Sequence, residues 1–236
     1  LKSGIWRYNY GTVRNLNISI HDTDTDSLHL SDFGVAVYTH QIEYFGIVEV
    51  NKGTIENCNV TMRIDRKDQW SLDIGGITIY NDGTIRDCIA DLKVDVTATT
   101  GDLPGVWTGG IAMFSRENSL IDHCLVLGHF NASGSKAHNI SLAGIADLTT
   151  DTARCVDSAF AMDKAEVLCQ DQYYFSPAFQ TWTGSVAGAE NCRVANDIPY
   201  QNIVTHDNPG NSNDPINESG IFSGGPGYTL ASRASI

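Results

Sequence analysis

The chain has 236 residues and a formal net charge of −13, from 15 basic and 28 acidic side chains, and 42% of its residues are hydrophobic. Such an acidic chain lacks the cationic face that nucleic-acid backbones and anionic membrane surfaces attract, so neither is expected as a partner. The hydrophobic content is enough for a folded core, and no apolar run approaches the roughly 18 residues of a membrane-spanning helix. Because no initiator methionine or signal peptide opens the sequence, we expect a piece of a larger protein.

A pattern of Gly, an apolar residue, Asn, Gly-Thr, an apolar residue and Cys recurs along the chain. Three copies align without gaps, and a longer, a shorter and a degraded copy follow them: Gly4–Leu16, Gly46–Cys58, Gly76–Cys88, Gly110–Cys124, Gly144–Cys155 and Ser185–Cys192. Self-similarity at a period of about 30 residues indicates a repeat architecture.

Short runs of alternating apolar residues within each repeat predict strands, as at Leu92, Val94 and Val96. This spacing excludes helical repeats, and a propeller blade would need about 40–45 residues. We therefore predict an all-β parallel β-helix of about six to seven coils, with loop insertions and one short helix at Ala159–Cys169. A single domain would cover 1–236, with coils over about 4–192 and a loop-rich tail or cap over about 193–236.

Five of the six cysteines share one repeat position. Equivalent residues of neighbouring coils stack about 4.8 Å apart in this fold. The sequence therefore predicts an inward ladder of buried thiols formed by Cys58, Cys88, Cys124, Cys155 and Cys192. Cys169 lies outside this repeat position and is the candidate for a specific disulfide pair.

Polar and glycine positions of the repeat are predicted to form the turns between strands. Asn57 and Asp87 precede the cysteine, and Asn51 and Asn81 precede the Gly-Thr pair, where Asn side chains bond the backbone. The glycines after these asparagines, such as Gly53, are expected to supply a corner with positive φ.

The first insertion carries alternating carboxylates, Asp22, Asp24 and Asp26. They resemble the first half of a calcium loop, but the glycine and the final glutamate of such a loop are missing. Calcium is therefore a candidate cofactor, and a solvated acidic turn is the alternative.

Three tryptophans lie near the other insertions, at Trp70, Trp107 and Trp182. Exposed on a solenoid, they would stack on sugar rings or on a partner protein. The alternative is that each packs beneath a loop. The aromatic run at 173–182 is predicted to seal the core where a loop crosses it.

The pattern GGIxxxNxGTIxxC resembles the GLUG repeat of bacterial surface proteins, over about residues 4–192 and best over 46–124. That resemblance implies a right-handed β-solenoid at a cell surface and adhesin-like relatives. It implies no activity, because a fold does not specify a function.

Catalytic motifs of metalloproteases and serine hydrolases are missing from the sequence. The carboxylates weighed for glycan chemistry, Asp122 beside His123, Asp147 and Asp151, fit turn positions at least as well. Aligned by repeat, the outward series reads Arg14, Glu56, Arg86, Asp122, Ala153 and Glu190. The charges of the first four residues alternate in sign, which favours surface ion pairs between neighbouring coils. Hydrolysis of a glycan needs two carboxyl groups close together, so no hydrolase or lyase turnover is expected.

The leading hypothesis is a non-catalytic β-solenoid module, secreted or at a cell surface, that acts in adhesion or binds a host or cell-surface glycan or protein. A polysaccharide lyase or glycoside hydrolase of β-helix fold is one alternative. A structural subunit that self-associates in an extracellular assembly is the other.

Overall fold

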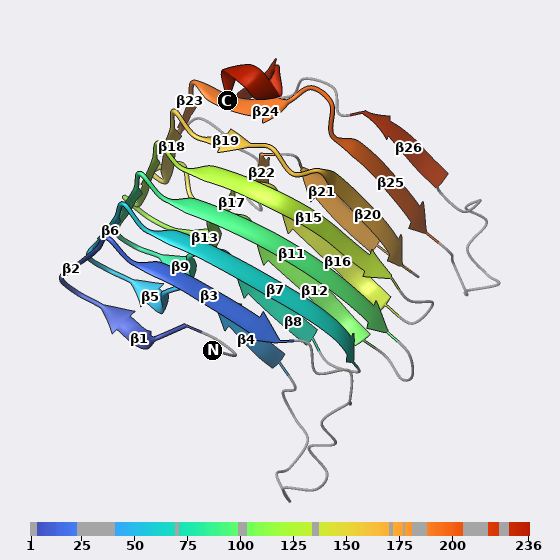
Figure 1. The fold of residues 1–236 in the computed structure, drawn as a ribbon, viewed down its shortest axis with the longest axis horizontal. Helices are drawn as coiled ribbons and strands as arrows, with labels where there is room; N and C mark the ends of the chain where they lie inside the picture. The colour runs from blue at the N-terminus through green and yellow to red at the C-terminus, as the bar shows by residue number, and fades with distance from the viewer. Residues whose placement is uncertain are drawn as a thin grey trace, which may run out of the picture.

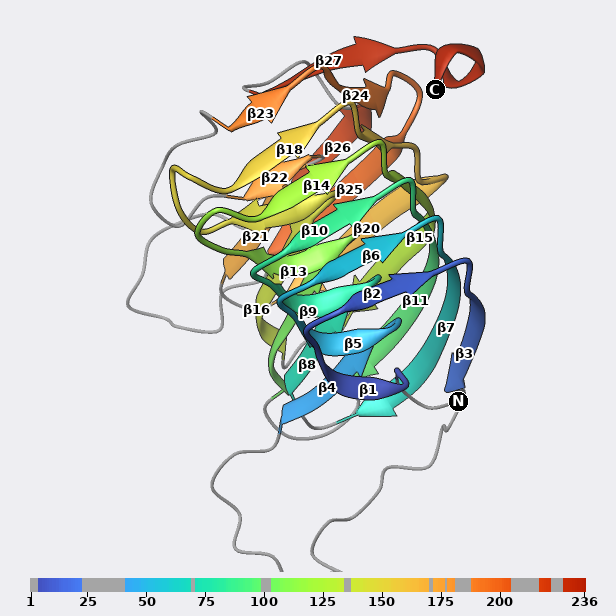
Figure 2. The same cartoon turned by 90° about the vertical axis from the view of Figure 1, so that its left-hand side faces the viewer.

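The structure is a computed structural model that describes residues 4–22, 41–68, 71–98, 103–133, 137–169, 172–176, 178–180, 188–204, 217–221 and 227–236. Their strands form a parallel β-solenoid with four sheets. Successive coils stack from the N-terminal to the C-terminal end (Figures 1 and 2). Sheet A contains β1 (Trp6–Asn9), β5 (Val48–Asn51), β9 (Thr78–Asn81), β13 (Ala112–Ser115), β17 (Ala146–Leu148) and β22 (Phe179–Gln180). Sheet B contains β2 (Thr12–Arg14), β6 (Thr54–Glu56), β10 (Thr84–Arg86), β14 (Leu120–Asp122), β18 (Arg154–Val156) and β23 (Ala189–Glu190).

Sheet C is the largest and holds the C-terminal strands. It contains β3 (Asn17–Asp22), β7 (Asn59–Asp68), β11 (Ile89–Ala98), β15 (Leu125–Ser133), β19 (Ala159–Phe160), β20 (Lys164–Cys169), β24 (Cys192–Ala195), β25 (Pro199–Val204), β26 (Asn217–Ile221) and β27 (Tyr228–Ala231). Sheet D contains β4 (Gln41–Phe45), β8 (Ser71–Gly75), β12 (Leu103–Gly109), β16 (Ala137–Ala143) and β21 (Gln172–Ser176).

About four turns of the solenoid are regular, from β1 to β16, because each contributes one unbroken strand to every sheet. In the next turn the strand of sheet C is split into β19 and β20. The predicted all-β parallel solenoid is thus confirmed, with fewer regular coils than the six to seven expected from the repeats.

The two ends of the solenoid differ. At the N-terminal end β1, β2, β3 and β4 each pair with one neighbouring strand. At the C-terminal end β26 pairs antiparallel with β25, and β27 pairs with β24. The 3-10 turn η2 (Arg233–Ser235) follows, and Arg233 donates to the carbonyl oxygens of Ala161 and Met162 at 2.8 and 2.6 Å. Among the described residues no helix is long and apolar enough to cross a bilayer.

The predicted helix at Ala159–Cys169 is wrong, because this segment forms β19 and β20. Its backbone hydrogen bonds go to the preceding coil, from the amide of Ala161 to the carbonyl of Val126 and from Asp163 to Gly128. Within β20 the side chains alternate, with Ala165 and Val167 buried, as a strand on a core requires. Pairing with the existing sheet therefore overrides the helix propensity of this alanine-containing stretch.

A ladder of buried asparagines runs through the first three coils. Asn9 donates its side-chain amide to Oδ1 of Asn51 at 2.9 Å, and Asn51 donates to Oδ1 of Asn81 at 2.9 Å. Asn81 donates in turn to the hydroxyl of Ser115 at 3.4 Å, which bonds that of Ser119 at 2.8 Å. These side chains hold the corner between sheets A and B, as the sequence predicted for asparagine at this repeat position.

A second polar column supplies the left-handed backbone at the corner between sheets B and C. Its members all have φ between 47° and 58°: Asn15, Asn57, Asp87, His123, Asp157 and Asn191. The expected positive φ at Gly53 is wrong. Glycine is needed there for close stacking instead, because a Cβ would lie 2.1 Å from the carbonyl oxygen of Gly11.

Of the residues predicted to form the thiol ladder, Cys58, Cys88, Cys124 and Cys192 are buried at the same position of their coils. The prediction is wrong for Cys155, which pairs with Ile121 three residues earlier in the repeat. The place expected for Cys155 is taken by Ser158, whose hydroxyl bonds the carbonyl of Val156 as the Cys124 thiol bonds that of Asp122. The prediction of Ala153 in the outward series of sheet B is therefore also wrong, because Val156 is the register partner of Asp122.

We expect the Cys58, Cys88 and Cys124 thiols of the folded protein to resist alkylation by iodoacetamide at pH 7.5. All three are at most 2% exposed, and hydrogen bonding to Cys124 raises the pKa of Cys88 to about 12. Only the thiolate reacts, so both access and ionisation are suppressed. Mass spectrometry after brief labelling should find these positions modified only in denaturant, and labelling of the native chain would contradict the ladder.

Candidate functional site

Exposed aromatic rings gather on sheet A, along the corner with sheet B. Tyr8, Val50, Tyr80 and Phe114 are register partners on successive coils and form one outward column. Tyr10 follows the first of these strands and is 72% exposed. We call Tyr8, Tyr10, Tyr80 and Phe114 the aromatic strip.

The rings of the strip are stacked in pairs. The centroids of Tyr80 and Phe114 are 5.6 Å apart with an interplanar angle of 19°, and those of Tyr8 and Tyr10 are 6.1 Å apart at 25°. Tyr8 is 46% exposed, and the Tyr80 and Phe114 side chains are half-buried. Offset stacking fixes each ring and leaves part of its face open to a ligand.

Cationic side chains flank both ring pairs. The guanidinium of Arg116 lies 4.6 Å from the Tyr80 centroid and also bonds Asp82, with nitrogen–oxygen distances of 2.5 and 2.7 Å. Arg7 lies 5.4 Å from the Tyr8 centroid and Lys52 lies 5.9 Å from that of Tyr10. The strip therefore offers apolar ring faces next to hydrogen-bond donors and two carboxylates, those of Asp82 and Glu49.

A pair of acidic side chains lies beside the strip on sheet D. Glu43 and Asp73 are register partners on β4 and β8, so both carboxylates project from the same face on neighbouring coils. Burial and then the charge of Glu49 raise the pKa of Glu43, while Arg7 opposes this effect. Glu43 is half-buried, whereas Asp73 is only 1% exposed. The sequence missed this pair because both residues precede the repeat motif that was aligned.

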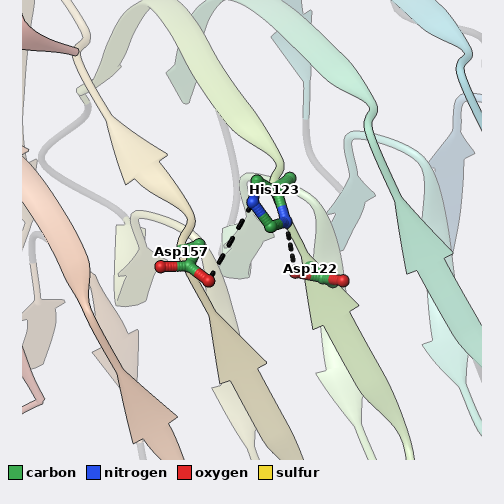
Figure 3. A group of neighbouring side chains, drawn as sticks. All are labelled: Asp122, His123 and Asp157. Carbon is green, nitrogen blue, oxygen red and sulfur yellow. Dashed lines mark hydrogen bonds and ion pairs between the residues drawn. The ribbon is translucent and has the colours of Figure 1, made fainter.

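Asp122, His123 and Asp157 form a second polar cluster at the corner between sheets B and C (Figure 3). Nδ1 of His123 lies 2.5 Å from Oδ1 of Asp122, and Nε2 lies 4.0 Å from Oδ2 of Asp157. Hydrogen bonding to Asp122, followed by the charges of Asp122, Asp157 and Asp87, raises the pKa of His123. The cluster has the ligand types of a cation site, but an imidazole must lose its proton to bind a metal. The raised pKa of His123 therefore works against metal binding at this cluster.

Of the candidate calcium ligands, Asp22 lies within the core region. Its Oδ2 accepts hydrogen bonds from the Tyr44 hydroxyl at 2.7 Å and from Nη1 of Arg66 at 2.8 Å, and the side chain is 3% exposed. This arrangement gives Asp22 a structural role. Asp24 and Asp26 lie outside the described residues, so the calcium site stays a prediction.

Trp107 is half-buried on β12, between Asp73 and Ser141 on the outward face of sheet D. Trp70 and Trp182 lie outside the described residues.

Asp147 is 3% exposed on β17 and pairs with Phe114, and Asp151 is exposed in the next turn. The structure therefore does not bring Asp122 together with Asp147.

The outward series of sheet B behaves partly as the sequence predicted. The guanidinium of Arg86 bonds the carboxylate of Glu56 on the preceding coil, so this neighbouring pair is neutralised. Asp122, the next member, pairs with His123 of its own coil instead.

The aromatic strip was missed by sequence reasoning, although a signal for it exists. Tyr8, Val50, Tyr80 and Phe114 each lie four residues after the first glycine of their repeat. Reading the variable positions of the aligned repeats, in addition to the constant ones, would have shown this column.

Comparisons with family models, with curated proteins and with solved structures found no match to the chain.

Proposed function

We propose that the chain is a non-catalytic β-solenoid module, secreted or at a cell surface, that binds a glycan along the aromatic strip. The observation that carries this proposal is the pair of stacked rings, Tyr80 and Phe114, held at an accessible corner with Arg116 beside them. The GLUG resemblance agrees with a surface location and with adhesion.

The chemistry of the strip suits a chain of sugars. Ring faces of tyrosine and phenylalanine pack against the apolar faces of sugar rings, and neighbouring polar groups bond the hydroxyls. Tyr8 and Tyr80 are two coils apart, which is about 9.6 Å at the strand spacing of 4.8 Å. A ligand could thus contact both ring pairs only if it extended along the solenoid axis, as an oligosaccharide does.

We expect the double variant Tyr80→Ala/Phe114→Ala to bind its glycan roughly tenfold or more weakly, because central aromatic contacts dominate such interfaces. Affinity electrophoresis against neutral and uronate-containing polysaccharides would identify the ligand class, and calorimetry would give the affinity. Ile89→Ala is the matched control, since Ile89 is an exposed apolar residue on sheet C. Binding that survives loss of both rings would refute the strip as the site.

A second candidate function, a glycoside hydrolase or lyase, is favoured by Glu43 and Asp73. Carboxyl groups on neighbouring coils come close to the roughly 5–5.5 Å separation of retaining glycosidases, and a raised pKa suits a general acid. The burial of Asp73 opposes this function because a nucleophile must reach the sugar. Release of reducing sugar or of an unsaturated uronate, lost in Glu43→Gln and kept in Glu166→Gln, would establish the enzyme in place of the binder.

A further inference from the structure

The ladder thiols make a recurring contact with the coil before them. Sγ of Cys88 lies 3.9 Å from the carbonyl oxygen of Ile55, and Sγ of Cys124 lies 3.7 Å from that of Ile85. Cys192 repeats the contact on the carbonyl oxygen of Cys155, at 3.4 Å. The residue contacted is in each case the central inward residue of a sheet B strand.

Cys155 changes the chemistry of this contact. In the three preceding coils its position is held by isoleucine, at Ile55, Ile85 and Ile121, and in the first coil by Val13. Because a thiol replaces the branched side chain, Sγ of Cys192 lies 3.7 Å from Sγ of Cys155. This contact joins two different positions of the repeat, whereas Cys58, Cys88 and Cys124, whose thiols also bond one another, share one position.

The two thiols differ in access and in acidity. Both are buried in the core, with Cys155 0% and Cys192 1% exposed, but Cys192 also lines a depression of about 410 Å³ together with Asp157, Asn191, Arg193 and Tyr228. The hydrogen bond between the two thiols lowers the pKa of Cys192, and burial raises that of Cys155. Cys192 is therefore the thiol that would react first with a small reagent, with Cys155 placed to resolve the product.

We propose that Cys155 and Cys192 form a redox-active pair that closes to a disulfide on reaction with a low-molecular-weight disulfide such as oxidised glutathione. The Cys192 thiolate attacks one sulfur of the reagent, forms a mixed disulfide and releases one glutathione thiolate. The Cys155 thiol then gives its proton to solvent and attacks Sγ of Cys192, which releases the second glutathione thiolate. Two protein thiols are oxidised and one reagent disulfide is reduced, which balances the electrons.

Closing the pair requires a small movement. The sulfur–sulfur separation must shorten from 3.7 Å to about 2.05 Å. The bond would join β18 to β24, the strand on which the terminal strand β27 is paired. Oxidation would thereby lock the C-terminal end of the solenoid onto the coil before it.

The test uses the full chain carrying Cys169→Ser, so that each tryptic peptide of interest contains one cysteine. Cleavage after Arg154, Lys164 and Arg193 gives peptide 155–164 with Cys155 and peptide 165–193 with Cys192. After incubation with oxidised glutathione at pH 8 and acid quenching, mass spectrometry should find these peptides joined, with the loss of two hydrogens. The urea midpoint of the oxidised chain should rise and should return on reduction.

Two variants remove the pair with side chains that the solenoid already accepts at these positions. Cys155→Ile restores the residue of the earlier coils, and Cys192→Ser copies Ser158. Both variants should fold and show no shift of the urea midpoint. Cys155→Ile should stop at the mixed disulfide, and Cys192→Ser should fail to react. The control Cys88→Ser should keep the cross-link. A folded chain that forms no 155–192 cross-link, or that cross-links Cys58 to Cys88 equally well, would overturn the proposal.

Discussion

Replacing Arg66 with methionine is expected to lower the free energy of unfolding by about 3–5 kcal/mol, because it removes one partner of a buried ion pair. Arg66 is 2% exposed, and its Nη1 bonds both Oδ2 of Asp22 at 2.8 Å and the Tyr44 hydroxyl at 3.0 Å. The variant leaves the Asp22 carboxylate buried without its counter-charge, which costs far more than an exposed ion pair contributes. The hydrogen bond from Tyr44, whose pKa is raised by burial and by this bond, cannot replace the guanidinium.

Urea unfolding followed by circular dichroism would measure this loss. Lys67→Met is the matched control, because Lys67 is the next residue of the same strand and is exposed, so its change should stay within about 0.5 kcal/mol. The double variant Asp22→Leu/Arg66→Met removes both charges and should recover much of the stability. A loss below about 1 kcal/mol in Arg66→Met would show that the buried ion pair is not formed.

Truncating Asn51 to alanine is expected to cost about 3 kcal/mol or more. Asn51 accepts from Asn9 and from the amide of Gly53, and it donates to Asn81 and to the carbonyl of Thr84. The truncation leaves several of these buried groups without a partner, at about 1–3 kcal/mol each.

Asn59→Ala provides the comparison for Asn51→Ala. Asn59 lies in the same coil and also donates to an asparagine of the first coil, Asn17, at 2.9 Å, but it is exposed. Water replaces the lost hydrogen bond there, so the cost should remain below about 1 kcal/mol. Equal losses in the two variants would mean that the inner ladder contributes no more than a surface contact.

The repeat positions that carry the fold could be predicted because each has one physical requirement. Asn51 and Asn81 must bond the backbone at a corner, and alternating residues such as Leu92 and Val94 must reach the core. These requirements recur in every coil and are therefore visible as a period in the sequence. The same periodicity correctly excluded a helical repeat protein.

The misplacement of Cys155 shows where periodicity fails. The aligned cysteines allowed the fifth copy to end three residues early, at Cys155, although in the structure it continues to Ser158. Serine and cysteine both bond the carbonyl two residues before them, so chemistry at this position accepts either residue. Alignment by residue identity could not detect an exchange that the hydrogen bond tolerates.

The candidate site was harder to predict than the fold. The aromatic strip depends on positions that differ from coil to coil, with Val50 between Tyr8 and Tyr80. The pairing of Glu43 with Asp73 depends on how sheet D aligns after insertions of unequal length. Neither arrangement leaves a constant pattern, because binding surfaces are not required to repeat.

The asparagine ladder also bears on how the chain finds the correct order of its coils. The second and third coils start 30 residues apart, at Gly46 and Gly76, and both place asparagine on the ladder. A chain that skipped one coil while folding would still satisfy these bonds, so the ladder fixes alignment within a coil without counting coils. The irregular positions distinguish one coil from the next. Ser115 ends the asparagine series, and Cys155 interrupts the isoleucine column. Coils that were all identical could stack in several orders of similar energy. The departures from the repeat thus make one order of coils the lowest in energy.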